Sequence, residues 1–344
     1  MTTGWQVKKA ISILIVSMMV TLLVAGCARV GESAPEQTGL ASLVPEGATF
    51  IAGMQPDKGL GDPDIKALFQ DIAAKRGKDS ESAKHLSIQD IKDKLGVDPS
   101  SLTEAVVFGR NPSESSSDRW AAAIGKGAFD KDKLLSAIEQ RLGKEPASVD
   151  YNGITIYAVE THKGQHGLAF LAPGTLVAGT QQAVKDVVDV FKGTKPHLTG
   201  QLSDVYNGLG NTLVKGASIL PASLEDRAVS NLMGGFVDPA LVLDAQIGAM
   251  SLDKSSTSFT SKVSLYYPTA AEAAKAHALL QAGLPLADLL SASSNPAYVA
   301  AARVLSKAQV SSANAGVTVT LAATPDQVGA IIDAMPSGIY SPVK

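Results

Sequence analysis

Asp150-Tyr151-Asn152-Gly153-Ile154 is the strongest local structural signal in this chain of 344 residues. An Asn-Gly pair supplies the two positive φ angles that a two-residue type I′ turn requires. Antiparallel strands are therefore expected on both sides of this turn. A second turn at Pro173-Gly174 predicts another pair of strands, residues 168–172 and 176–179.

Helices with clear end signals alternate with these strands. Four positions have a side chain that can accept from the first free backbone N–H groups of a helix: Asp130, Thr180, Thr269 and Thr324. Glu272 completes a capping box with Thr269, and Gly143 and Gly193 are placed to end the first two helices. We therefore expect an α+β fold, with mostly antiparallel sheets and helices packed on one face.

The order of these elements suggests two similar halves. Each half starts with a strand and a helix, continues with more strands, and ends with a strand that leads directly into a threonine-capped helix. Residue identity between the halves is low, so a duplication stays open. The expected segments are a signal peptide (1–26), a flexible tether (27–42), a first half (43–193), a linker (194–215), a second half (216–337) and a tail (338–344).

The amino-terminal segment has the composition of a secretion signal. Lys8 and Lys9 precede residues 10–26, which are uncharged and mostly apolar, and small residues lead up to Cys27. These 17 residues lie at the short end of what crosses a bilayer, since about 20 are preferred. Cleavage is therefore expected in place of a permanent membrane span.

The boundary Leu23-Val24-Ala25-Gly26-Cys27 resembles the bacterial lipobox. The resemblance implies a lipoprotein in which the Cys27 thiol is diacylated and the new amino terminus is acylated after cleavage. The alternative is an uncleaved anchor in which Cys27 is an ordinary buried thiol. Acyl chains on Cys27 would hold the protein outside the cytoplasm on the cell membrane or the outer membrane. Ala28, in place of aspartate, favours the outer membrane.

Net charge and cysteine content argue against nucleic-acid binding and against disulfide bonds. Without residues 1–26 the chain has 28 Lys and Arg against 33 Asp and Glu, and the basic residues do not cluster. Nucleic acid is therefore not an expected partner. Cys27 is the only cysteine, so burial of apolar surface must stabilise the fold without disulfides.

A second resemblance concerns the predicted layout. Residues 43–47 (Leu-Val-Pro-Glu-Gly) and the hairpin at 151–154, within this layout, are similar to an uncharacterised bacterial family of exported proteins, known only as a domain of unknown function. This resemblance implies no activity.

Motifs for catalysis or metal binding are weak. Among five histidines, His162 and His166 share one loop and could ligate a metal if the loop folded back, but the segment also reads as a solvated loop. The other three, His85, His197 and His277, are isolated. Ser251 and Lys254 match a bare S-x-x-K pattern, but at the end of a strand and without a downstream K-T-G.

Three carboxylate pairs lie at expected helix starts: Asp62/Asp64, Asp90/Asp93 and Asp130/Asp132. Acidic residues stabilise helix amino termini, so we interpret these pairs as caps in preference to acid/base pairs. No catalytic residue, cofactor site or metal site is assigned.

Three functions remain open. The first is a lipid-anchored, non-catalytic binding or envelope-assembly module, whose partner is an envelope protein. The second is a carrier or sensor of an apolar ligand, suggested by the Ala- and Leu-rich residues 270–290. The third is a hydrolase whose site residues meet only in the folded chain.

Overall fold

The computed structural model describes residues 39–68, 97–110, 120–161, 164–220, 244–287, 291–292 and 296–333. The strands are β1 (Phe50–Met54), β2 (Leu102–Gly109), β3 (Ala121–Gly127), β4 (Ala147–Tyr151), β5 (Ile154–Thr161), β6 (Gly164–Ala172), β7 (Thr175–Thr180), β8 (Val214–Ile219), β9 (Ile247–Lys254), β10 (Phe259–Tyr266), β11 (Gln309–Ala313) and β12 (Gly316–Ala323). The helices are η1 (Leu40–Leu43), α2 (Pro56–Gly61), η3 (Pro99–Ser101), α5 (Lys131–Leu142), α6 (Gln181–Phe191), α7 (Gln201–Gly208), α10 (Ala270–Gly283), η5 (Leu284–Ala287), α12 (Pro296–Leu305) and α13 (Pro325–Asp333).

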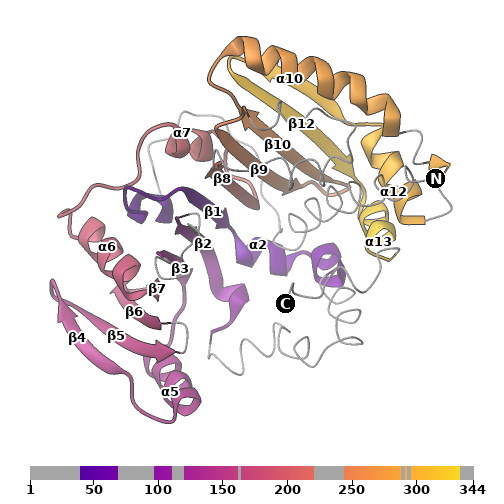
Figure 1. The fold of residues 1–344 in the computed structure, drawn as a ribbon. Coiled ribbons are helices and arrows are strands. Elements are labelled where there is room, and N and C mark those ends of the chain that lie inside the picture. Colours follow the sequence, from indigo (N-terminus) through magenta and orange to yellow (C-terminus); the bar gives the residue numbers. More distant parts are fainter. Residues whose placement is uncertain are drawn as a thin grey trace.

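All strands of the described part form one sheet of 12 strands, in the order β11-β12-β10-β9-β8-β1-β2-β3-β7-β6-β5-β4 (Figure 1). Each neighbouring pair is antiparallel. The two halves of the chain meet where β1 pairs with β8, from Phe50 opposite Ser218 to Met54 opposite Val214. The α+β class is therefore confirmed, and the halves share a continuous sheet.

The two halves use the same strand order outward from this central pair. In the first half the order is β1, β2, β3, β7 and β6, and in the second it is β8, β9, β10, β12 and β11. In each half, the strand that comes last in the sequence (β7 or β12) lies beside the third strand (β3 or β10). A helix, α6 or α13, follows that last strand. The first half adds the outer hairpin of β5 and β4.

The hairpin predicted from Asn152-Gly153 is confirmed. Asn152 and Gly153 have φ angles of 54° and 73°, and β4 and β5 pair directly on either side, with Tyr151 opposite Ile154. Asn314 has φ 52° in a similar short turn between β11 and β12. Both edges of the sheet are therefore formed by tight hairpins.

Helices cover both faces of the sheet, and the prediction of helices on one face was wrong. On β1, Ile51 packs in a cluster that contains Tyr206 of α7, whereas Met54 packs against a cluster that contains Val304 of α12. Residues three apart on a strand point to opposite faces because side chains alternate. In Figure 1, α6 lies beside β6 and β7, and α12 lies beside β12.

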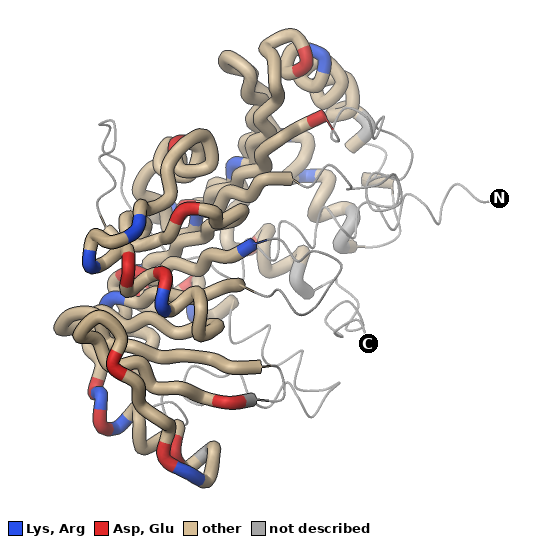
Figure 2. The backbone as a smooth tube through the Cα atoms, turned by 60° about the vertical axis from the view of Figure 1, so that its left-hand side comes forward, with Lys and Arg blue, Asp and Glu red and all other residues tan. Residues whose placement is uncertain are grey.

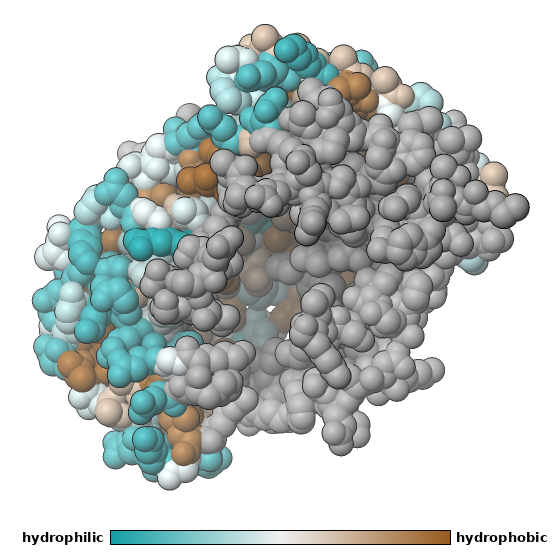
Figure 3. All heavy atoms as spheres, viewed as in Figure 1, coloured by the Kyte–Doolittle hydropathy of each residue, from teal (hydrophilic) through white to brown (hydrophobic). Residues whose placement is uncertain are grey.

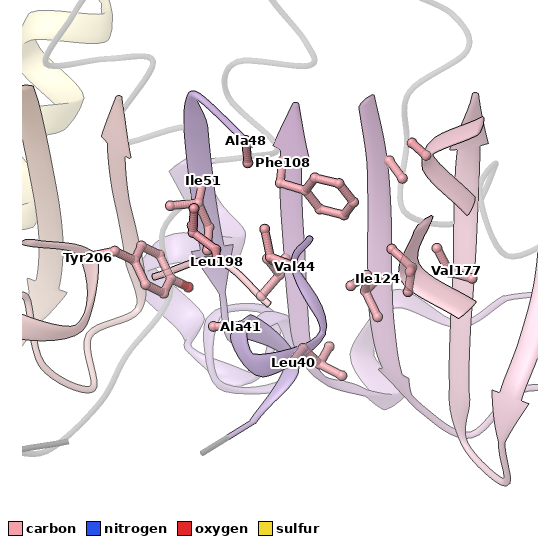
Figure 4. Close-up of a cluster of buried hydrophobic side chains, with 14 of the residues drawn as sticks. Leu40, Ala41, Val44, Ala48, Ile51, Phe108, Ile124, Val177, Leu198 and Tyr206 are labelled. Carbon is pink, nitrogen blue, oxygen red and sulfur yellow. The ribbon is translucent and has the colours of Figure 1, made fainter. Parts of the chain in front are cut away.

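The largest core cluster lies on the face covered by α6, α7 and η1. Phe108 and Trp120 meet there edge to face, with ring centroids 5.3 Å apart. Figure 4 shows residues of neighbouring strands packed against those of η1 and the segment that follows it. These residues are Ile51, Phe108, Ile124 and Val177 from the sheet, and Leu40, Ala41 and Val44 from the amino-terminal segment.

Two predicted segment boundaries need correction. The predicted tether (27–42) reaches too far, because Leu40 and Ala41 are buried in the core. The predicted linker (194–215) contains α7 and the start of β8, and Leu198 is buried. Local composition suggested exposed chain at both places, whereas distant residues cover them.

The signal peptide (1–26), Cys27 and the tail (338–344) lie outside the described residues. So do the predicted helix at 87–96 and the predicted helix near 224–233. Among the described residues, no helix combines the length and apolar composition needed to span a membrane.

Gly53 on β1 lets α7 approach the sheet closely. A Cβ atom at this position would overlap the hydroxyl group of Tyr206, whose ring is buried at 3% exposure. Gly216, on the neighbouring strand β8, has room for a methyl group, with the nearest heavy atom 3.4 Å from an added Cβ. The two glycines therefore differ in how much space the fold leaves them.

Gly53→Ala should lower the free energy of unfolding by about 1–3 kcal/mol, since overpacking displaces buried side chains. Denaturant unfolding should show almost no change for the control, Gly216→Ala. Adding Tyr206→Phe removes the overlapping hydroxyl and should restore part of the loss in Gly53→Ala. Equal losses for both glycine variants would contradict the proposed close contact.

Candidate functional site

The residue assigned a function from sequence, Cys27, lies outside the described part, which begins at Gly39. The described chain begins with a short segment that is fastened to the sheet through Glu104. We call residues 39–43 together with Glu104 the anchor junction.

The anchor junction is held by a carboxylate. The backbone N–H of Leu40 donates to both oxygens of Glu104, at 3.1 and 3.2 Å. Gly39 has φ 102°, and a Cβ atom there would lie 2.8 Å from Glu104 Oε1. Glycine therefore fits this position in both conformation and space.

The segment after α6 braces the same region. The N–H of Leu198 donates to the carbonyl of Val44 at 2.7 Å, and the N–H of Glu46 donates to the carbonyl of Pro196 at 3.3 Å. Pro45 and His197 form a bridge between these hydrogen bonds. Residues 194–200, which the sequence suggested as a linker, thus clamp the start of the fold.

Burial and charge shape the electrostatics beside the anchor junction. Burial raises the pKa of Glu104, and this outweighs the lowering by the Leu40 N–H, Lys126 and Lys215. Burial lowers the pKa of Lys215, whose ammonium donates to the carbonyl of Gly210 at 2.8 Å. It lies 4.4 Å above the ring of Tyr206. Glu104 therefore holds residues 39–43, whereas Lys215 holds the loop after α7 and packs on Tyr206 of α7.

A second charged cluster fixes α6 to the sheet. We call Asp186, Asp189 and Lys195 the α6 latch; Lys195 Nζ lies 2.6 Å from Asp186 Oδ1 and 3.0 Å from Asp189 Oδ2. Asp186 also accepts from Trp120 Nε1 at 2.7 Å, and Asp189 accepts from Tyr151 Oη at 3.1 Å. The latch thereby connects α6 to the start of β3 and to the β4–β5 hairpin.

The α6 latch favours the ionised form of Asp186. Burial by itself would raise the pKa of Asp186, but hydrogen bonds from Lys195, Trp120 and Gln182 together lower it below its usual value. The two carboxylates raise the pKa of Lys195. Sequence analysis missed this cluster, although two aspartates three residues apart among the valines of an apolar helix stripe were a signal for it.

The S-x-x-K residues do not form a catalytic pair. Ser251 and Lys254 both lie on β9 and are buried, but residues three apart on a strand point to opposite faces. Lys254 Nζ instead lies 2.6 Å from a carboxylate oxygen of Asp62 and 2.8 Å from one of Asp64. The lysine therefore ties residues 62–64 to the end of β9.

The interpretation of two carboxylate pairs as helix caps is confirmed. Asp62 Oδ1 accepts from the backbone N–H groups of Asp64 and Ile65, at 3.0 and 3.1 Å. Asp130 Oδ1 accepts from the N–H of Lys133 at 3.0 Å. The third pair, Asp90/Asp93, lies outside the described residues. The ion pair between Asp62 and Lys254 was not predicted.

The described histidines occupy separate elements. His166 is on β6, His197 is in the brace after α6, and His277 is on α10. His85 and His162 lie outside the described residues, so the His162/His166 metal hypothesis stays a prediction. Within the described ranges, no group of three or more His, Cys, Asp or Glu residues is placed to hold a metal ion.

An open depression of about 530 Å³ lies between the start of α5 and the ends of β3 and β6. Asp98, Asp130 and Lys133 are among its lining residues. Asp98 accepts from the N–H of Ser100 at 3.0 Å, and Asp130 caps α5. Both carboxylates therefore already stabilise local turns of the chain.

Lys195→Met should lower the free energy of unfolding by about 1–3 kcal/mol at pH 7, because it leaves two buried carboxylates without their cation. The loss should shrink at pH 2. Since the pKa of Asp186 is lower in the folded chain, its stabilising contribution is present above its ordinary pKa of 3.8 and is lost as pH falls through the folded value.

Denaturant unfolding at both pH values tests this prediction, with Lys192→Met as the control. Lys192 is the exposed residue that follows α6, and its substitution should change stability little at either pH. A loss from Lys195→Met that is the same at pH 7 and pH 2 would argue against the electrostatic role of the latch.

Comparison with known proteins assigns no family. No family model matches the chain, and no curated protein matches it. Crystal form III of the Treponema protein TP0453 is similar at 14% identity and a TM-score of 0.48, over 87% of this chain and 99% of that one. Crystal form I gives 13% identity and a TM-score of 0.44, over 88% and 97%. Likeness at this level assigns no function to the chain.

Proposed function

We propose that this protein is a lipid-anchored module outside the cytoplasm that binds or assembles envelope components without catalysis. The lipobox-like residues 23–27 support export and attachment to a membrane. The observation that supports the absence of catalysis is that the charged groups at the core each hold a neighbouring part of the chain. Glu104 holds Leu40, the α6 latch holds α6, and Lys254 holds Asp62 and Asp64.

A short connection to the membrane is part of this proposal. Eleven residues separate Cys27 from Gly39; as the flexible tether that their composition predicts, they would have a root-mean-square span of about 18 Å. The 12-stranded sheet would then lie close to the lipid surface. Ala28 after the cysteine favours the outer membrane in a cell that has two membranes.

The carrier hypothesis loses its main motivation in the structure. It rested on the Ala- and Leu-rich residues 270–290, of which residues 270–287 are described. There, Ala273 and Ala276 of α10 are buried against Tyr267 and Val317. The small residues of this helix therefore serve close packing on the sheet.

We also propose that the two halves are copies of one unit. The shared strand order outward from β1 and β8 supports this proposal. A duplicated unit would give the module two related surfaces, one on each side of the central strands.

Cys27→Ser should abolish acylation and cleavage of the signal peptide while leaving the fold intact. Metabolic labelling with a fatty acid, followed by membrane fractionation and immunoblotting, tests this in the native cell. The control is Ser33→Ala, a change in the same stretch that leaves the cysteine in place. Equal labelling and equal processed size in wild type and Cys27→Ser would refute the lipid anchor.

A further inference from the structure

The two outermost strands of the sheet, β4 and β11, each have one side without a neighbouring strand among the described residues. In β4, residues 147–150 are exposed. Such an edge presents backbone N–H and C=O groups that can pair with another strand. The edges are therefore candidate interaction surfaces.

The tight turn determines which groups of β4 face outward. In a two-residue hairpin, the residues next to the turn exchange both backbone hydrogen bonds, and such pairs then alternate along the strands. Tyr151 pairs with Ile154 and Val149 with Ile156, so these residues bond inward to β5. The backbone groups of Ser148 and Asp150 consequently point away from the sheet.

The β4 edge has little protection against pairing. Residues 147–151 contain no proline and no lysine, and their register with β5 is unbroken. The one charged side chain, Asp150, lies 3.3 Å from the N–H of Gly153, within the turn. Edge strands usually carry proline, lysine or a bulge to prevent association.

An exposed apolar side chain marks the centre of this edge. Val149 is 48% exposed, the highest value among the large exposed hydrophobic residues of the described part. Phe191, 38% exposed, ends α6 two residues after Asp189, which contacts Tyr151 of the same hairpin. Figure 3 shows brown patches in its lower left, where β4, β5 and α5 lie in Figure 1.

We propose that the β4 edge binds a second copy of this chain, antiparallel and two-fold symmetric about Val149. In this register Ser148 of each copy exchanges backbone hydrogen bonds with Asp150 of the other. Val149 meets its own counterpart at a non-hydrogen-bonded position, where side chains are closest. The single acidic residue faces a serine, so no like charges oppose each other.

The opposite edge fits a second copy less well. The equivalent centre of β11 is Ser311, which is polar. The one large apolar residue of β11, Val310, packs against the cluster of α10. Self-pairing through β4 gives a closed dimer, because both copies use the same surface. This inference does not depend on the lipid anchor.

Val149→Cys in the full-length chain, purified in detergent, tests the register directly. The two Cα atoms of such a pair lie about 4.5 Å apart, within the range that a disulfide spans. Mild oxidation should give a covalent dimer on a non-reducing gel. The amount of covalent dimer from Ser311→Cys should not exceed that from the wild type, in which Cys27 is the only cysteine. Equal cross-linking of both variants, or none above background, would overturn the proposal.

Proline substitution provides an independent test. Ser148→Pro removes an outward N–H and leaves the bonds to β5 intact. Sedimentation should show wild type as a dimer and Ser148→Pro as a monomer. Ser312→Pro removes an outward N–H of β11 and should leave a dimer. A monomeric wild type, or a dimer lost only in Ser312→Pro, would overturn the proposal. If Ser148→Pro does not fold, the cysteine result decides.

Discussion

The antiparallel pairing of β1 with β8 is the constraint on which the rest of the structure depends. Five residue pairs, from Phe50–Ser218 to Met54–Val214, join strands that are 160 to 168 positions apart in the chain. This pairing turns two sets of strands into one sheet of 12. It also gives β1 a helix layer on each face, and Gly53 allows α7 to pack directly on it.

Charged groups also join segments of the chain, in addition to the hydrophobic clusters. Glu104 accepts from Leu40 across 64 positions, Asp186 of the α6 latch accepts from Trp120 across 66, and Lys254 pairs with Asp62 across 192. Charged residues of both signs are interspersed along the described chain, as Figure 2 shows. Removal of one partner of a buried ion pair is destabilising, because the remaining charge is left without compensation.

Sequence analysis predicted the local features well. The Asn152-Gly153 hairpin, the capping box of Thr269 and Glu272, and the Asp130 cap are all confirmed, because each depends on residues within a few positions. The long-range features could not be predicted. Lys254 contacts Asp62 across 192 positions, and Leu40 contacts Glu104 across 64. Strands such as β1, which are apolar on both faces, gave no period that shows which face a helix covers.

The central claim is that this module is fixed to a membrane through Cys27. Intact-mass analysis of the protein purified from its native membrane tests the claim most directly. We expect a chain of residues 27–344 that carries the added mass of a diacylglyceryl group and an amide-linked acyl chain. A chain that still begins at Met1, or one that begins at Cys27 without acyl mass, would contradict the account.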